Sequence, residues 1–370
     1  MADVLEIVDH DQDLGGLASL DGFTLRDGGH IRSEIVIQHD HIAPYCLDHA
    51  SRRLVLADLP PELDLSSGPF PLVDQKVSAR RLIAVPYDEL PQLADRVSPP
   101  DKLVFVFNSA RAGSTLLHQI FNEMDGMVSF SELDFFTNLV SIAHRADDRS
   151  RLTDLLRQCV RLFAYPFADQ TVAFKFRSDC VDIADLFHAA FPAARNIFLY
   201  RNAIDWSASW WRMHLEAGGP EVIDITDLRA DRAHRTGRTT HFDRVVHPAA
   251  TTAPYYLAML PIWLITIDAY LRHYERGVPF LALRYEDLDE HRDAMLAKVL
   301  DHVGLPRHGL AQALRGFEGD SQAGTALERK DGKPNQVTLN DSQVLTIVDI
   351  LERQPTPLSP NVILPGTFLP

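Results

Sequence analysis

Residues 103–117 place a basic side chain and several hydroxyl side chains directly after an apolar run. The run 103–107 has the length and composition of a buried strand, and the polar loop 108–113 follows it. Ser114 and Thr115 then begin an apolar pattern with helical spacing. A strand, a tight loop and a helix N-terminus direct successive backbone N–H groups and the positive end of the helix dipole at one point. The segment therefore predicts an anion-binding site.

The residues of this loop narrow the choice of anion. A nucleoside-triphosphate loop reads G-x-x-x-x-G-K-[ST], with the lysine on the phosphates and the hydroxyl on Mg²⁺. Here Ser114 follows Gly113 where that lysine would stand, the first glycine is absent, and the basic residue is Arg111. Such a loop can hold a phosphate, but it lacks the groups that handle a triphosphate and its metal. A strand-to-helix turn without a ligand remains the alternative.

A second segment carries the same combination of residue types. The apolar run 197–200 predicts a short buried strand, Arg201 stands at its end, and 203–213 predicts a helix that carries Ser209. A guanidinium offers a planar fork to a phosphate dianion, and the Ser209 hydroxyl, eight residues later, adds a donor. The alternative is that Arg201 forms a salt bridge with Asp205 while Ser209 faces solvent.

Both strings resemble motifs of the sulfotransferases that use 3′-phosphoadenosine 5′-phosphosulfate (PAPS). They are S-x-R-x-G-S-T at 109–115 and R-N-A-x-D-x-x-x-S at 201–209. The resemblance extends over roughly 102–340 and implies PAPS as co-substrate and 3′-phosphoadenosine 5′-phosphate (PAP) as product. It further implies that the first motif holds the 5′-phosphosulfate and the second the 3′-phosphate, through Arg111, Ala112, Gly113, Ser114, Thr115, Arg201 and Ser209.

Two later segments resemble the same family. Residues 284–288, Arg-Tyr-Glu-Asp-Leu, follow an apolar run and match a string whose role in the family is mostly structural. Arg329 and Lys330 resemble a C-terminal Arg-Lys-Gly segment that folds over the 3′-phosphate, which would make both residues cofactor-binding. Asp331 separates this pair from Gly332 and departs from the family pattern, so a solvated turn is the alternative.

Sulfuryl transfer requires an enzyme to hold the donor in line, stabilise the leaving phosphate and deprotonate the acceptor. Arg111 and the 113–115 backbone and hydroxyls suit the first two tasks. The resemblance places Lys175 beside the transferring sulfonate, and Arg177 stands where some branches of the family have a histidine base. No metal is required, because a sulfonate carries less charge than a γ-phosphate.

Glu132 is the candidate base, because other branches of the family use a glutamate just after the first helix. It would need a pKa raised by burial near Phe130, Phe135 and Phe136 to work near neutral pH. The alternative is a helix start in which Ser131 is the N-cap and the acids lie in the first turn. Asp134 and His118 are second choices for the base.

The composition indicates a soluble globular protein in a reducing compartment. The formal charge of −15 argues against a nucleic-acid or anionic membrane surface, and the three cysteines show no metal-binding spacing. The first residues are acidic and do not fit a signal peptide, and no apolar run reaches the length of a membrane span. We therefore expect a cytoplasmic protein rather than a membrane-anchored carbohydrate sulfotransferase.

The chain is expected to divide into an accessory region, 1–100, and a sulfotransferase domain, 101–370. Short apolar runs at 34–38, 53–57 and 81–85 predict a small β-rich unit that could cover the acceptor, support a homo-oligomer or serve as packing. From 102 onward, strands alternate with helices, which predicts an α/β fold with a central parallel sheet flanked by helices. The resemblance implies the P-loop NTPase-like fold of sulfotransferases.

The periodicity predicts strands at 171–176 and 196–200, helices at 131–145, 150–164, 180–190, 203–215 and 255–275, and an irregular connection at 216–254. Trp206 and Trp210 are spaced for core packing, and stacking on an acceptor or on adenine is the alternative.

The leading hypothesis is a metal-independent, PAPS-dependent sulfotransferase that modifies a hydroxyl or amine of a small molecule. The aromatic, mixed-charge segments at 130–145 and 206–254 favour a neutral, partly apolar acceptor. The alternatives are a P-loop kinase or NTPase, and a non-catalytic protein that binds a 3′-phosphonucleotide.

Overall fold

The computed structural model describes residues 1–11, 16–68, 70–145, 148–236, 250–319 and 338–370. Contacts between Cα atoms divide the chain into two compact units. The first comprises Met1–Phe105, Phe121–Phe176 and Ile183–Ala194, and the second comprises Val106–Ile120, Arg177–Asp182 and Arg195–Pro370. The units follow spatial contacts rather than chain order, so a domain boundary at residue 100 stays a prediction.

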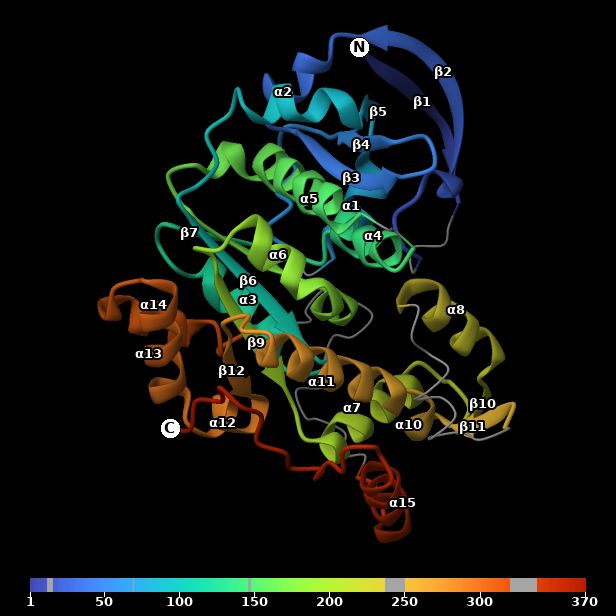
Figure 1. Cartoon of the computed structure of the whole chain (residues 1–370), viewed down its shortest axis with the longest axis vertical. Coiled ribbons are helices and arrows are strands. Elements are labelled where there is room, and N and C mark those ends of the chain that lie inside the picture. Colours follow the sequence, from blue (N-terminus) through green and yellow to red (C-terminus); the bar gives the residue numbers. More distant parts are fainter. Residues whose placement is uncertain (12–15, 69, 146–147, 237–249, 320–337) are drawn as a thin grey trace. The chain divides into compact units, whose positions relative to one another are not determined.

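The N-terminal part of the first unit is an antiparallel sheet, which confirms the predicted β-rich region (Figure 1). The runs predicted at 53–57 and 81–85 are strands of this sheet. The run at 34–38 is not a strand but lies mainly in a 3₁₀ helix, Ser33–Ile37, whose buried residues Ser33 and Val36 are one such turn apart. The strand order is β2-β1-β5-β4-β3, with bounds β1 Ala2–His10, β2 Phe23–Ile31, β3 Ile42–Asp48, β4 Arg53–Asp58 and β5 Arg81–Pro86.

Helices cover this sheet and fill the core of the first unit. Helices α4 and α5 pack against β3, and α5 also contacts α2 and α6 (Figure 1). Helix α5 begins where the Asp148 side chain accepts hydrogen bonds from the Ser150 and Arg151 backbone N–H groups. The bounds are α1 Pro71–Ser78, α2 Leu90–Ala94, α4 Asp134–Ala143, α5 Arg149–Ala164 and α6 Ala184–Ala190.

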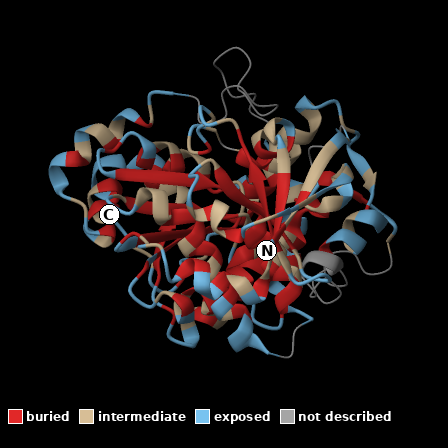
Figure 2. Cartoon of the chain, turned by 90° about the horizontal axis from the view of Figure 1, so that it is seen from above, coloured by how far each residue is buried: buried red, intermediate tan, exposed pale blue. Residues whose placement is uncertain are grey.

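A second five-stranded sheet confirms the predicted α/β class. Its order is β12-β9-β6-β8-β7, and β7 pairs with β8, and β9 with β12, in parallel. The inner strands β9, β6 and β8 are almost wholly buried (Figure 2), as expected for a parallel sheet with helices on its faces. The bounds are β6 Lys102–Asn108, β7 Met127–Ser131, β8 Thr171–Lys175, β9 Arg195–Tyr200 and β12 Leu281–Arg284.

In the described ranges, the residues with a predicted chemical role follow the carboxyl end of a strand of this sheet or lie on the helix after it. Glu132 follows β7, Lys175 ends β8, the 109–113 loop follows β6, and Arg201 follows β9. In parallel sheets this edge is where ligands bind.

The helices of the second unit follow its strands. The predicted helices at 114–124, 203–215 and 255–275 are confirmed, the last with a break after Ala258. The bounds are α3 Ser114–Asn122, α7 Ala203–Glu216, α8 Thr226–Thr236, α10 Tyr255–Ala258, α11 Leu260–Glu275, α12 Tyr285–Glu290, α13 Arg292–Val303, α14 Leu310–Arg315 and α15 Asp341–Glu352.

Two parts of the chain contain structure that the sequence pattern did not indicate. The helix predicted at 131–145 is present as α4, but it begins at Asp134, and the strand β7, which the pattern did not indicate, ends at Ser131. The connection 216–254 contains α8 and a small antiparallel ladder of β10, Val222–Asp224, with β11, Thr252–Pro254. Strands of three residues are too short to show a periodicity.

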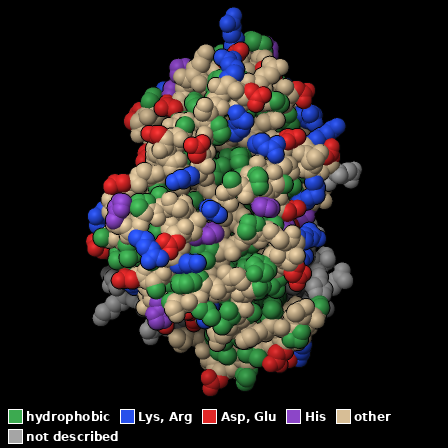
Figure 3. All heavy atoms as spheres, turned by 60° about the vertical axis from the view of Figure 1, so that its left-hand side comes forward, with side chains coloured by type: hydrophobic (Ala, Val, Ile, Leu, Met, Phe, Trp, Pro, Cys, Tyr) green, Lys and Arg blue, Asp and Glu red, His purple; other side chains and the backbone are tan. Residues whose placement is uncertain are grey.

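Charges on the described surface are mixed. On the face that Figure 3 shows, Lys and Arg side chains are interspersed with Asp and Glu. None of the helices in the described ranges is long and apolar enough to span a membrane.

We expect Phe174→Ala to lower the free energy of unfolding by about 3–5 kcal/mol, because the Phe174 ring is fully buried in a cluster of aromatic side chains. Its ring centroid lies 5.2 Å from that of Phe136 and 5.6 Å from that of Phe163. Urea denaturation followed by tryptophan fluorescence measures the change. Val77→Ala, at a side chain that is 53% exposed, is the control and should have little effect. Equal costs for the two variants would contradict the burial assignment.

Candidate functional site

The loop after β6 has an unusual backbone. Ala110 and Arg111 have φ values of 58° and 47°, and Gly113 has a φ of 81°. The Asn108 side chain fixes the start of the loop, because its Oδ1 accepts a hydrogen bond from the Ala110 N–H at 2.8 Å. Helix α3 begins directly afterwards at Ser114. The structure therefore has the predicted strand, tight loop and helix N-terminus.

Left-handed backbone in non-glycine residues is concentrated at the predicted site residues. Within the described ranges, the non-glycine residues with positive φ are Arg52, Ala110, Arg111 and Glu132. Such conformations cost roughly 1–3 kcal/mol each and persist where the surrounding structure holds them. Two of these residues lie in the 109–113 loop and a third is the candidate base.

Arg111 connects the two predicted phosphate motifs. Its Nε donates a hydrogen bond to Ser209 Oγ at 3.1 Å, and Ser209 is buried on α7. The pKa of Arg111 is lowered to about 10, mainly by burial and further by the nearby positive charges of Arg212 and Arg201. The guanidinium is still protonated at neutral pH, so a partly desolvated cation lies near two other cations, and the carboxylate of Glu216 acts in the opposite direction. Such an arrangement favours an anion.

Arg212 belongs to this cluster and was not predicted. It lies three residues after Ser209 on α7, so the two residues share a helix face. This spacing of three residues is the sequence feature that could have identified Arg212 as part of the site.

Arg201 is held by an aromatic ring rather than by the carboxylate of Asp205. Its guanidinium carbon lies 4.6 Å from the centroid of the Tyr285 ring. Asp205 Oδ2 instead accepts a hydrogen bond from Asn202 Nδ2 at 2.5 Å. In the described part of the chain, the buried Nε of Arg201 has no hydrogen-bond partner. The alternative in which Arg201 pairs with Asp205 while Ser209 faces solvent is therefore wrong.

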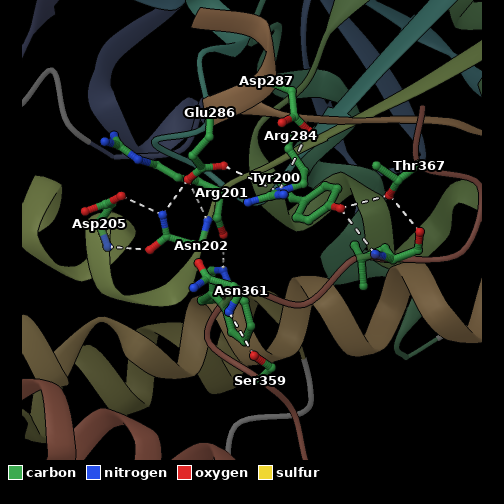
Figure 4. A network of polar contacts seen from close by, with 12 residues as sticks. Tyr200, Arg201, Asn202, Asp205, Arg284, Glu286, Asp287, Ser359, Asn361 and Thr367 are labelled. Carbon is green, nitrogen blue, oxygen red and sulfur yellow. Dashed lines mark hydrogen bonds and ion pairs between the residues drawn. The ribbon is translucent and has the colours of Figure 1, made fainter. Parts of the chain in front are cut away.

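The backbone beside Arg201 is fixed by a network of polar contacts (Figure 4). Glu286 Oε1 accepts hydrogen bonds from the Asn202 backbone N–H at 3.0 Å and from Asn202 Nδ2 at 2.6 Å. The Asn202 side chain caps α7 by accepting from the Asp205 N–H at 2.8 Å. The 284–288 string, to which no chemistry was assigned, thus supports the turn that carries Arg201.

The C-terminal segment supports the same turn. Pro360 O accepts a hydrogen bond from the Ala203 N–H at 3.0 Å, in the first turn of α7. Tyr200 Oη lies 2.8 Å from Thr367 Oγ1 and accepts a hydrogen bond from the Leu364 N–H at 3.2 Å (Figure 4). Residues more than 150 positions apart in the chain therefore hold the end of β9 in place.

Trp206 supports the 109–113 loop from α7. Its Nε1 donates to the carbonyl oxygens of Ser109 at 2.7 Å and Ala110 at 2.8 Å. The indole is fully buried, as the helical spacing predicted. Its N–H also orients the loop carbonyls, which that spacing did not reveal.

In the first unit, Glu132 and Lys175 form an ion pair. Lys175 Nζ contacts Glu132 Oε1, and the Glu132 N–H donates to Lys175 O at 2.7 Å. Lys175 is buried and Glu132 is partly exposed. An ammonium group against a carboxylate favours its ionised form, whereas the sequence suggested an apolar environment. A helix start with Ser131 as N-cap is wrong, since Ser131 ends β7 and the N-cap of α4 is Leu133.

The other predicted site residues have the following places. Asp134 lies in the first turn of α4, and its Oδ2 accepts a hydrogen bond from the Ala18 N–H at 2.9 Å. His118 is buried on α3. Arg329 and Lys330 lie outside the described residues. In the described ranges, no group of three or more His, Cys, Asp or Glu side chains is arranged to hold a metal ion.

The solved structures to which the chain is similar are sulfotransferases. The sulfotransferase domain of the Synechococcus PCC 7002 olefin synthase is 17% identical with a TM-score of 0.38, over 68% of this chain and 94% of that domain. The sulfotransferase domain from the curacin biosynthetic pathway is 17% identical with a TM-score of 0.40, over 73% of this chain and 95% of that domain. The Alicyclobacillus acidocaldarius sulfotransferase is 13% identical with a TM-score of 0.38, over 61% of this chain and 94% of that protein.

No family model and no curated protein sequence matches the chain. Because these TM-scores are below 0.5, the likeness does not by itself assign an activity to this protein.

We expect Arg111→Met to be at least as stable as the wild type without added anions, with a gain of up to about 2 kcal/mol. The substitution removes a desolvated charge that faces Arg201 and Arg212. Millimolar pyrophosphate should raise the melting temperature of the wild type and not that of the variant. Arg151→Met, at a side chain that is 79% exposed, is the control and should keep the response to pyrophosphate. A pyrophosphate response that survives in Arg111→Met would contradict this assignment.

Proposed function

We propose that the protein is a PAPS-dependent sulfotransferase that modifies a hydroxyl or amine of a small molecule. The observation that carries the proposal is the desolvated Arg111 guanidinium, which lies near Arg201 and Arg212 and bonds to Ser209. This arrangement joins the two motifs that resemble the phosphosulfate and 3′-phosphate motifs of the family. A nucleotide with two separate phosphate groups matches such a cluster of cations.

The residues of the second unit fit this nucleotide. The N–H groups of 113–115 and the Arg111 guanidinium would bind the 5′-phosphosulfate, and Arg201 and Ser209 would bind the 3′-phosphate. The unpartnered Nε of Arg201 is a donor that such a phosphate would satisfy. PAPS supplies the sulfuryl group, and the guanidinium charges stabilise the leaving phosphate.

Glu132 is the proposed base and Lys175 its partner. The carboxylate would take the proton of the acceptor hydroxyl as the new bond to sulfur forms and the bond from sulfur to the 5′-phosphate oxygen breaks. Lys175 would hold the carboxylate ionised before the reaction and approach the transferring sulfonate during it. The electron pair of the broken bond remains on the phosphate of PAP.

The acceptor is proposed to be neutral and partly apolar. Several aromatic side chains follow the second motif, including Trp210, Trp211 and Tyr256, and the Trp211 and Tyr256 rings lie 5.8 Å apart. Activity on sulfated polysaccharides, without activity on phenols or alcohols, would overturn this part of the proposal.

We expect the wild type to bind PAP with micromolar affinity in calorimetric titrations. Arg111→Ala and Arg201→Ala should each lose most of this binding, because hydrogen-bonded charge pairs with phosphate would be lost. ATP with Mg²⁺ should not replace PAP. A preference for ATP would instead support a kinase or NTPase.

We expect Glu132→Gln to lower the turnover of labelled PAPS by about 10²–10⁴-fold with little change in PAP affinity, because the base is lost and the donor residues remain. The rates are measured with whichever phenol, alcohol or amine the wild type modifies. Glu62→Gln, at an exposed carboxylate, is the matched control and should retain full activity. Binding of PAP with no turnover by the wild type would support a non-catalytic nucleotide-binding protein.

A further inference from the structure

Tyr285 is the first residue of α12, directly after β12, and it contacts both of the predicted phosphate-binding segments. The sequence alone gave this tyrosine no chemical role. Its two contacts are with Gly113 and with Arg201, which are 88 positions apart in the chain.

The first contact is with the backbone of the 109–113 loop. A Cβ atom added to Gly113 would lie 2.6 Å from Cδ2 and 2.9 Å from Cε2 of the Tyr285 ring. Real Cβ atoms do not approach carbon this closely, so the ring occupies the space that any other residue at 113 would need. The positive φ of Gly113, 81°, also favours glycine. The ring therefore limits where the loop backbone can lie.

The second contact is with the Arg201 guanidinium, whose central carbon lies 4.6 Å from the ring centroid. This distance is within the range of a cation–π interaction. The Arg201 Nε has no hydrogen-bond partner in the described ranges, which leaves the ring as a principal support of the side chain. The next residue, Glu286, holds the backbone N–H of Asn202. Two adjacent residues thus fix the side chain of Arg201 and the turn that carries it.

We infer that Tyr285 is a positioning residue that couples the 109–113 loop to Arg201 through one ring. The inference rests on the proposed function, because it assigns the two segments to two phosphate groups of one nucleotide. Its ring would set the spacing between the groups that bind the two phosphates, which suits a nucleotide with phosphates at both the 5′ and the 3′ positions.

The contribution of the 3′-phosphate to binding tests this coupling. PAP and adenosine 5′-phosphate are titrated calorimetrically into the wild type, Tyr285→Phe and Tyr285→Leu. Tyr285→Phe keeps the ring and should bind both nucleotides as the wild type does. Tyr285→Leu should weaken the binding of PAP about tenfold more than that of adenosine 5′-phosphate, because PAP uses both segments and adenosine 5′-phosphate only the 109–113 loop, so the preference for PAP falls. An unchanged preference in Tyr285→Leu would overturn the inference while the proposed function stands.

Amide hydrogen exchange of the nucleotide-free protein tests the positioning without any nucleotide. Tyr285→Leu should exchange faster than the wild type in both the 109–113 and the 200–203 segments, and Tyr285→Phe should not. Tyr165→Leu, at a half-buried tyrosine of the first unit, is the control and should leave both segments unchanged. Unchanged exchange in Tyr285→Leu would overturn the inference.

The two measurements separate the failure of the inference from that of the proposed function. If the wild type does not bind PAP, the proposed function fails, and hydrogen exchange still decides whether Tyr285 positions the two segments. If Tyr285→Leu does not fold, Tyr285→Met, with a flexible apolar side chain, takes its place in both measurements.

Discussion

The arrangement around the candidate site depends on one electrostatic constraint, the placement of the partly buried Arg111 guanidinium near other cations. In the protein without a ligand this placement is unfavourable, because both desolvation and like charge oppose the charged form. Only a rigid surrounding structure can keep the guanidinium there. The Ser209 hydroxyl accepts its Nε–H, and Trp206 and Asn108 fix the loop that carries it.

The position of Arg111 requires a rigid surrounding, which explains why many residues of the second unit support the 109–113 and 201–203 segments. Glu286, Trp263 and Pro360 each bind a backbone group of 201–203. None of these three residues would need to contact a nucleotide. A binding site that is set before its ligand arrives loses less conformational entropy on binding, so these contacts favour affinity.

The sequence predicted the parts of the site that are local in the chain. Strand, loop and helix in 103–117 follow one another within a few residues, and so do Arg201 and Ser209, so composition and spacing indicated both. The contacts of Tyr285 with Gly113 and of Trp206 with Ser109 join residues far apart in sequence and leave no periodic signal. The fold was predictable for the same reason: long buried strands and helices were found, whereas β7 and the short ladder of β10 with β11 were not.

The Glu132–Lys175 pair shows why a side chain's chemistry is harder to predict than its position. The place of Glu132 after a strand agrees with the resemblance, and its neighbouring phenylalanines suggested an apolar environment. Parallel pairing of β7 with β8 instead puts Ser131 opposite Lys175, and the Glu132 N–H bonds to the Lys175 carbonyl. Glu132 has a left-handed backbone conformation, with a φ of 49°, and its side chain contacts the ammonium group of Lys175. Strand register, which the sequence does not reveal, therefore determines that Lys175 is the residue placed beside this carboxylate.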